Sequence, residues 1–137
     1  MNLLHGQLPL AQQSAALKHC PDSCDGSVVL ASAIAESSVT IDGVRLVIDS
    51  GLSRQLRFDP NTGMEGLETV PSSIASADQR RGRAGRQGPG QCIRLWSPSE
   101  QHRRPSFSPP ELQLADPQPV LMELAQWGAG LGETLPW

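Results

Sequence analysis

The sequence predicts an α/β domain built on a mostly parallel β-sheet flanked by helices. Two short apolar runs rich in β-branched residues, 27–32 and 44–49, have the composition of strands that are buried on both faces. A small, hydroxyl-rich connection separates these runs, and the alanine-rich segment 8–18 before them favours a helix. Buried strands joined by short connections and accompanied by helices are typical of a parallel α/β core.

The N-terminal residues 1–6 have the pattern of the second half of a core strand that leads into a turn. Further along, segments 53–58 and 66–70 alternate polar and apolar residues. They flank residues 59–63, which are dense in Asp, Pro, Asn and Gly. This arrangement predicts a β-hairpin that projects from the sheet.

Residues 73–81 predict a helix, because a serine is available as its N-cap and Gly82 follows its last turn. Residues 93–96 predict another strand. The Pro- and Ser-rich segment 97–110 predicts an extended linker, and 120–127 a short amphipathic helix. Both ends look cut, so we expect a domain that is incomplete at its two ends.

The charges are few but unevenly placed. The chain has 137 residues, which suits one domain, and a net charge of −3, which excludes a global basic field. Ten of its eleven basic residues are Arg, and seven of these lie between Arg80 and Arg104. Arginine favours bidentate recognition of phosphate or carboxylate groups. The alternative interpretation is an exposed, solvated charge cluster.

Cysteine usage indicates a reduced protein. The three cysteines have no framework spacing, and Cys20 and Cys24 with His19 lack the second ligand pair of a zinc site. We therefore expect free thiols and no metal. The N-terminus has no leader pattern, and no stretch approaches 18 apolar residues. We expect a cytoplasmic protein with no membrane partner.

The segment Gln79–Arg86 carries the strongest chemical signal. Arg83 and Arg86 lie three positions apart, so a local helix would place both guanidinium groups on one face, a suitable arrangement for binding a γ-phosphate. Gln79 could orient an attacking water, and Gly82 keeps the approach free of side-chain bulk. A flexible Arg-Gly segment that binds RNA backbone, or a solvated loop, explains the same composition, and on composition alone these alternatives are together favoured.

Two sequence motifs shift the interpretation of this segment toward γ-phosphate binding. The segment Q-R-R-G-R-A-G-R at 79–86 resembles the last conserved motif of DEAH-box and related superfamily 2 helicases. Upstream, A-S-A-I-A-E-S-S-V-T-I-D-G at 31–43 is similar to the family motif A-T-N-I-A-E-T-S-L-T-I-x-G. The segments at 4–9, 47–51 and 58–63 also fit. The resemblance covers about residues 3–127. The short sequences D-S-G and R-F-D-P are most similar to those of the bacterial HrpB type.

The resemblance implies a RecA-like fold of the P-loop NTPase type, as the second lobe of a helicase. It implies a truncated lobe at 1–97, a linker at 98–115 and the start of a winged-helix region at 116–137. ATP would be shared with a first lobe, which would also hold Mg²⁺, and RNA would be the other partner.

Site residues follow from the same resemblance. Arg83 and Arg86 would be arginine fingers, with Gln79 positioning the water or the phosphate. Other residues would bind the nucleotide or the RNA sugar–phosphate backbone. The nucleotide set is Thr40, Asp42 and Gly82; the RNA set is Gly6, Ser32 and Ser37. Glu36 is expected to form structural hydrogen bonds rather than to act in catalysis.

The sequence also departs from the family pattern. Ala33 replaces the usual Asn, and Ser32 and Ser37 replace Thr. Neither a G-x-x-x-x-G-K-[ST] segment nor a D-E-x-H segment occurs in the chain, so we expect no ATP hydrolysis by these residues alone. The predicted function is part of an ATP-dependent RNA helicase. The alternatives are a standalone RNA-binding or regulatory fragment and a non-functional remnant.

Overall fold

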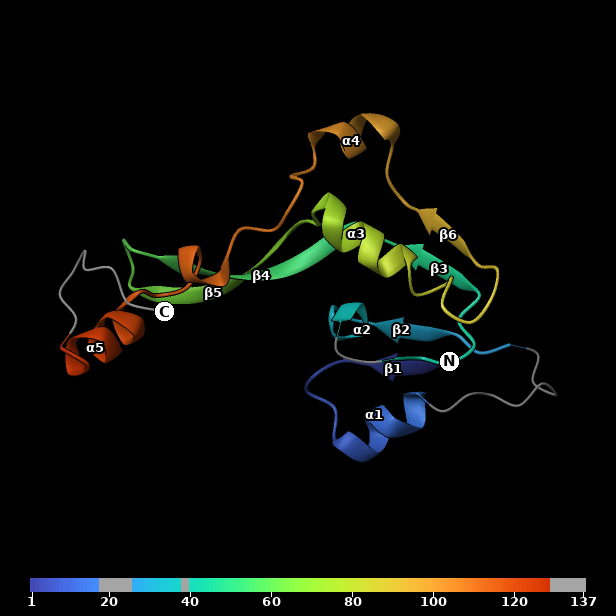
Figure 1. Cartoon of the computed structure of the whole chain (residues 1–137), viewed down its shortest axis with the longest axis horizontal. Coiled ribbons are helices and arrows are strands. Elements are labelled where there is room, and N and C mark those ends of the chain that lie inside the picture. The colour runs from blue at the N-terminus through green and yellow to red at the C-terminus, as the bar shows by residue number, and fades with distance from the viewer. Residues whose placement is uncertain (18–25, 38–39, 129–137) are drawn as a thin grey trace. The chain divides into compact units, whose positions relative to one another are not determined.

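A computed structural model describes residues 1–17, 26–37 and 40–128 of the chain (Figure 1). The elements in chain order are β1 (Asn2–Leu4), α1 (Leu10–Leu17), β2 (Val29–Ala31), α2 (Ile34–Ser37), β3 (Leu46–Asp49), β4 (Leu52–Asp59), β5 (Met64–Pro71), α3 (Ile74–Arg81), β6 (Gln91–Arg94), α4 (Pro98–Arg103), a 3-10 turn (Glu111–Gln113) and α5 (Gln118–Gln126). They form two compact units. The first contains Met1–Arg54 and Thr69–Ser108, and the second contains Gln55–Glu68 and the chain from Pro109 onward.

Parallel strand pairs form the framework of the first unit. Strand β1 pairs with β2, with Leu3 opposite Leu30, and β3 pairs with β6, with Ile48 opposite Ile93. Helix α1 packs on β1, while α3 packs on β3 and on α2 (Figure 1). The predicted α/β class and parallel pairing are confirmed. Within the described residues these parallel strands form two separate two-stranded sheets rather than one.

The predicted burial of β2 and β3 is wrong. Leu30 is 50% exposed, Leu46 48% and Ile48 61%. Apolar runs of this kind are typical of central strands, which have a partner strand on each side. In the described ranges β2 and β3 each have one partner strand only. As a result, the apolar residues that are wholly buried there are few. They are Leu4, Ala16, Ala77 and Ala84.

Helix α3 forms where the sequence predicts it. The Ser73 side chain caps its start by accepting a hydrogen bond from the N–H of Ser76, and Gly82 ends it. The N–H groups of Ile74 and Ala75 donate to carbonyl oxygens of residues 105 and 106, at 2.9 and 3.1 Å. Because the first N–H groups of a helix have no partner within it, these bonds anchor the start of α3.

Helix α4 corrects the prediction of an extended segment at 97–110. Pro98 occupies the first turn, where its missing N–H is tolerated. Ser97 and Glu100 form a capping box, in which each side chain accepts a hydrogen bond from the backbone of the other. These local bonds favour one and a half turns of helix in a segment whose proline content alone indicates a linker.

Arg104 fastens the end of α4 to the start of the hairpin. Its Nη1 donates to the carbonyl oxygens of Gly51 at 2.7 Å and Ser72 at 2.9 Å. Its guanidinium lies over the Trp96 ring, 4.1 Å from the ring centroid. Gly51 adopts a φ of +72°, and a Cβ there would overlap both Trp96 and Arg104. Glycine is therefore required at this position by conformation and by space. This group is termed the Arg104 clasp.

The predicted hairpin is confirmed, since β4 and β5 pair with each other. Its turn closes through the N–H of Gly63, which donates to the carbonyl oxygen of Asp59 at 2.8 Å while Gly63 has a φ of +67°. The Asp59 carboxylate accepts from the backbone N–H of Asn61, and this hydrogen bond lowers the pKa of Asp59. The turn therefore stabilises the charged form of Asp59.

In the second unit, the hairpin is bonded to the segment before α5. The N–H of Phe58 donates to the carbonyl oxygen of Leu114 at 2.7 Å, and the N–H of Asp116 donates to Glu65 at 3.2 Å. Helix α5 agrees with the predicted C-terminal helix and has no buried residue. In none of the described ranges is a helix both long and apolar enough to cross a membrane.

Leu4 is the largest wholly buried apolar side chain described, at 1% exposure. We predict that Leu4→Ala lowers the free energy of unfolding by about 2–5 kcal/mol, through lost burial and the cavity left behind. Urea unfolding followed by circular dichroism measures this loss. Leu3→Ala is the matched control, because Leu3 is the next residue and is 53% exposed. Equal losses in the two variants would contradict this account of the core.

Candidate functional site

The first unit contains a cavity of about 1010 Å³ between its two parallel strand pairs. Apolar residues of β2 and β3 form part of its wall. The rest includes polar residues from α3 and from the segments that follow β2 and α3. The charged and hydroxyl-bearing members among these are Ser32, Glu36, Asp42, Arg80, Arg83 and Arg86. The cavity therefore brings together residues from both of the sequence motifs.

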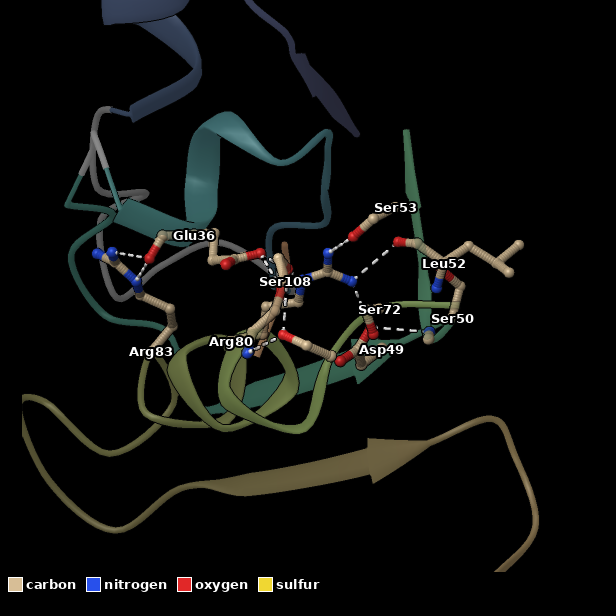
Figure 2. A network of polar contacts seen from close by, with 12 residues as sticks. Glu36, Asp49, Ser50, Leu52, Ser53, Ser72, Arg80, Arg83 and Ser108 are labelled. Carbon is tan, nitrogen blue, oxygen red and sulfur yellow. Dashed lines mark hydrogen bonds and ion pairs between the residues drawn. The ribbon is translucent and has the colours of Figure 1, made fainter. Parts of the chain in front are cut away.

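Arg80 joins these two motifs (Figure 2). Its Nε lies 2.9 Å from Glu36 Oε2, and its Nη1 lies 3.0 Å from Asp49 Oδ1. It also donates to the carbonyl oxygen of Leu52 at 3.1 Å and to the Ser53 hydroxyl at 2.8 Å. Both ion pairs are shielded, since the side chain of Arg80 is 16% exposed and that of Asp49 is 2% exposed.

The charges of this group balance one another. Burial acts to lower the pKa of Arg80, but its hydrogen bonds with Glu36 and Asp49 outweigh burial and raise the pKa. Asp49 Oδ1 also accepts from the N–H of Gly51 at 2.9 Å, while Asp49 Oδ2 is buried with no hydrogen-bond partner among the described residues. Asp49 therefore depends on Arg80 for compensation of its charge.

Glu36 contributes through both its side chain and its backbone. Its carboxylate accepts from Ser76 Oγ at 2.6 Å as well as from Arg80. Its carbonyl oxygen accepts from Arg83 Nε at 3.0 Å, and Arg83 Nη2 contacts the same oxygen (Figure 2). The predicted structural hydrogen bonding of Glu36 is confirmed. One residue thus holds both Arg80 and Arg83.

Arg83 lies beyond the end of α3, on turns rather than on a continued helix. Its N–H donates to the carbonyl oxygen of Arg80 at 3.0 Å, and the N–H of Ala84 donates to that of Arg81 at 3.2 Å. Burial, and then the nearby charge of Arg86, lower the pKa of Arg83. The helical arrangement considered for Arg83 and Arg86 does not form, but both side chains still reach the same cavity.

Arg86 and Gln87 reach from this turn segment to residues 40–43. Arg86 Nη1 donates to the Thr40 hydroxyl at 2.9 Å. Gln87 Nε2 donates to Asp42 Oδ1 at 2.7 Å, and Gln87 Oε1 accepts from the N–H of Gly43 at 2.7 Å. The two motifs are therefore joined a second time, through predicted nucleotide-binding residues.

The other predicted catalytic and nucleotide-binding residues lie apart from the cavity wall. Gln79 is exposed on α3. Gly82 is the C-cap of α3, and its N–H donates to the carbonyl oxygen of Asp78 at 3.0 Å. Thr40 is exposed and is connected to the cavity through Arg86.

The predicted RNA-binding residues follow the two strands of one sheet. Gly6 lies in the exposed turn after β1. Ser32 follows β2, and its N–H donates to the carbonyl oxygen of Leu4 at 3.0 Å. The backbone of Ser37 ends α2. The structure thus brings Gly6 and Ser32 to the same end of the parallel pair.

Sequence reasoning missed the roles of Arg80 and Gln87. Both lie beside residues that it assigned, Gln79 and Arg86. Their partners are far away in sequence: Arg80 and Glu36 are 44 positions apart, and Gln87 and Asp42 are 45 positions apart. The presence of both motifs in one chain, at 31–43 and at 79–86, is the signal in the sequence that these two segments come together. The cysteines considered for a metal, Cys20 and Cys24, lie outside the described residues.

We predict that Arg80→Ala destabilises the fold by about 3–5 kcal/mol, because it leaves buried carboxylate charge without compensation. Thermal and urea unfolding measure the loss. Arg81→Ala is the matched control, since its side chain is 62% exposed and its Asp78 partner is 3.6 Å away. The control is expected within about 0.5 kcal/mol of the parent. A loss for Arg80→Ala no larger than that for the control would refute the proposed importance of this ion-pair group.

Comparison with known proteins assigns the chain to a family. The model of the "Helicase conserved C-terminal domain" family matches residues 1–88. The ATP-dependent RNA helicase HrpB of Escherichia coli is 42% identical over 134 residues, which are 98% of this chain and 16% of that protein. The human probable ATP-dependent RNA helicase DHX34 is 35% identical over 98% of this chain and 12% of that protein.

Solved structures agree. The crystal structure of the E. coli DExH-box NTPase HrpB superposes with a TM-score of 0.86 and 44% identity, covering 93% of this chain and 16% of that one. A second structure, of the E. coli DEAH/RHA helicase HrpB, has a TM-score of 0.84 and 42% identity. The chain spans 16% of the length of E. coli HrpB and 12% of that of human DHX34. The two motifs, the parallel α/β fold with its β-hairpin, and these matches together show that the chain belongs to the helicase C-terminal domain family, in its HrpB-like DEAH/RHA branch.

Proposed function

We propose that this chain serves as the second motor lobe of an ATP-dependent RNA helicase, with Arg83 and Arg86 acting as arginine fingers. Their target would be the γ-phosphate of an ATP whose phosphates and Mg²⁺ are held by a first lobe. The observation that supports this role most directly is their placement. Both side chains line one cavity, and each is oriented by an oxygen of the other motif, the Glu36 carbonyl or the Thr40 hydroxyl.

The chemistry of Arg86 suits a group that changes partners. Its hydrogen bond is to a neutral hydroxyl, and its side chain is exposed. A phosphate oxygen is a stronger acceptor for a guanidinium than a hydroxyl is, so an arriving nucleotide would replace this bond favourably. Fixed guanidinium groups then stabilise the charge that develops on the phosphoryl oxygens in the transition state.

The proposed nucleotide contacts use the segment that these bonds fix. Thr40 and Asp42 would face the ribose side of the nucleotide, in the position set by Arg86 and Gln87. Gln79 would orient the water or the phosphate from the exposed surface of α3, and Gly82 would leave room for the nucleotide. The hydrogen bonds of Arg86 to Thr40 and of Gln87 to Asp42 support the assignment of those two residues.

The proposed RNA contacts lie where two parallel strands end. Gly6 and Ser32 follow β1 and β2, which pair in parallel, so their backbone groups emerge at one edge. Ligands commonly bind at the carboxyl ends of parallel strands. With Ser37, these residues would hold the sugar–phosphate backbone of RNA without reading its sequence. Such a lobe would act in the cytoplasm together with its first lobe.

The alternative is a standalone RNA-binding fragment that uses the arginines between 80 and 104. Its structural support is weaker, because three of these arginines have internal roles. Arg80 pairs with two carboxylates, Arg94 with Asp78 at 2.7 Å, and Arg104 bonds to backbone carbonyls. RNA binding by the chain that falls steeply with salt and ignores nucleotide would favour this alternative.

We predict that the 137-residue chain alone shows no RNA-stimulated ATP hydrolysis, because it contains neither a phosphate-binding loop nor a D-E-x-H segment. A phosphate-release assay with and without single-stranded RNA measures this. Turnover that is abolished by Arg83→Ala would overturn the prediction, since that result would require a complete active site within these residues.

The function itself is tested in a chimera in which these residues replace the matched region of E. coli HrpB. We expect the chimera to hydrolyse ATP. Arg83→Ala and Arg86→Ala should each lower kcat by a factor on the order of a thousand or more. Arg81→Ala is the matched control and should leave kcat unchanged. Full turnover in both finger variants would exclude the proposed role.

A further inference from the structure

The segment between α3 and β6, residues 82–90, carries both proposed fingers and is here termed the finger loop. Its two ends lie close together. Ala84 is 2% exposed, and a Cβ at Gly90 would overlap the Ala84 carbonyl group. The base of the finger loop is therefore held by packing, whereas its tip at 85–87 is exposed and depends on polar contacts for its position.

Two neighbouring side chains tie this exposed tip to the segment that precedes β3. Arg86 donates to a single neutral hydroxyl, that of Thr40. Gln87 instead makes two hydrogen bonds, each 2.7 Å long, to adjacent residues: its Nε2 donates to Asp42 Oδ1, and its Oε1 accepts from the N–H of Gly43. One side-chain amide thus satisfies an acceptor and a donor at once.

This pair of bonds requires an amide group at position 87. A carboxylate offers acceptors only, an ammonium group offers donors only, and an aliphatic side chain offers neither. A Gln87→Glu change keeps the acceptor for the Gly43 N–H but directs a second carboxylate at that of Asp42. The two bonds therefore depend on the chemistry of glutamine as well as on its length.

Gln87 is set back from the cavity. Among the described residues, Arg86 and Asp42 belong to the cavity wall and Gln87 does not. Any effect of Gln87 on a ligand there must therefore pass through its neighbours. In the proposed function, Arg86 exchanges Thr40 for the γ-phosphate, so its own link to the segment before β3 is lost. The two bonds of Gln87 do not take part in that exchange and remain in place.

From this arrangement we propose that Gln87 is a positioning residue for Arg86. Its amide holds the tip of the finger loop while the neighbouring guanidinium changes partner, so the Arg86 side chain starts from the same backbone position with either partner. Placement matters, because a displacement of about 1 Å can lower the rate of a catalysed step by about a hundredfold. The inference rests on the proposed function of Arg86 and adds to it a residue that does not touch the nucleotide.

The test uses the chimera in which these residues replace the matched region of E. coli HrpB, with ATP and single-stranded RNA. Gln87→Leu removes both bonds at similar side-chain size, and we expect kcat to fall by about ten- to a hundredfold. The Tm should stay within about 3 °C of the parent value, because the lost bonds are exposed. Gln87→Glu should lower kcat at least as far, since it preserves the shape but not the donor.

Gln91→Leu is the matched control. Gln91 is exposed at the start of β6, and its side chain makes no hydrogen bond within the part of the chain that the structure describes. This variant makes the same change of side chain four positions away and should leave kcat unchanged.

A double-mutant cycle separates positioning of Arg86 from other effects. In a chimera that already carries Arg86→Ala, Gln87→Leu should lower kcat by no more than about twofold, because the group that Gln87 positions is gone. A purely structural role, or a role through Asp42 alone, predicts the same loss with and without Arg86.

The hydrogen bond itself is measured in the 137-residue chain by amide hydrogen exchange. The N–H of Gly43 donates to Gln87, so it should exchange faster in Gln87→Leu, by about threefold or more. The N–H of Gly51, which donates to Asp49, is the internal control and should exchange at the parent rate.

Three results would overturn the inference alone: equal kcat in Gln87→Leu and Gln91→Leu, an equal loss of kcat with and without Arg86, or unchanged exchange at Gly43. In each case the loss of turnover in Arg86→Ala would leave the proposed function standing. A chimera without turnover, or one that keeps full turnover in Arg86→Ala, would remove the proposed function and this inference with it.

Discussion

Arg80 compensates the charge of two carboxylates, and the geometry of the site depends on this group. It joins helix α2, the end of β3 and the last turn of α3, which are far apart in sequence. Asp49 is 4% exposed and would be a buried charge without it. Arg80 lies at the end of α3, so its ion pairs also hold in place the start of the turns that carry Arg83 and Arg86.

The arginines of this segment differ in their partners. Arg80 and Arg94 bond to carboxylates, whereas Arg86 bonds to a hydroxyl and Arg104 to backbone carbonyls. A carboxylate partner is the stronger bond and holds an arginine in place. A hydroxyl partner leaves the positive charge available to a stronger acceptor. The partners therefore separate structural arginines from one suited to an anionic ligand, a distinction that charge counting alone does not make.

Local features of the structure could be predicted from the sequence. Helix α3 follows from its serine cap and its glycine end, and the hairpin follows from the turn residues between β4 and β5. The exposure of β2 and β3 could not be predicted, because exposure depends on neighbours that no local pattern specifies. Helix α4 was not predicted, because the high proline content of the segment 97–110 indicates a linker. The Ser97 and Glu100 of its capping box are nevertheless visible in the sequence.

The same limit applies to the site. The motifs identify Arg83 and Arg86 as residues of interest, and the structure places both on one cavity. The positioning role of Arg80 depends on contacts across 31 and 44 residues, which spacing within a motif cannot reveal. Sequence thus indicates which residues carry chemistry, and the fold shows which residues hold them.

The Arg104 clasp has a consequence for how this lobe diversifies. Gly51 adopts a positive φ, and the space next to its Cα is filled by Trp96 and Arg104. A larger residue at position 51 would need both neighbours to shrink and would still bear the conformational strain. Single substitutions at 51 should therefore be eliminated by selection. A mutational library of the clasp therefore gains nothing from randomising that position.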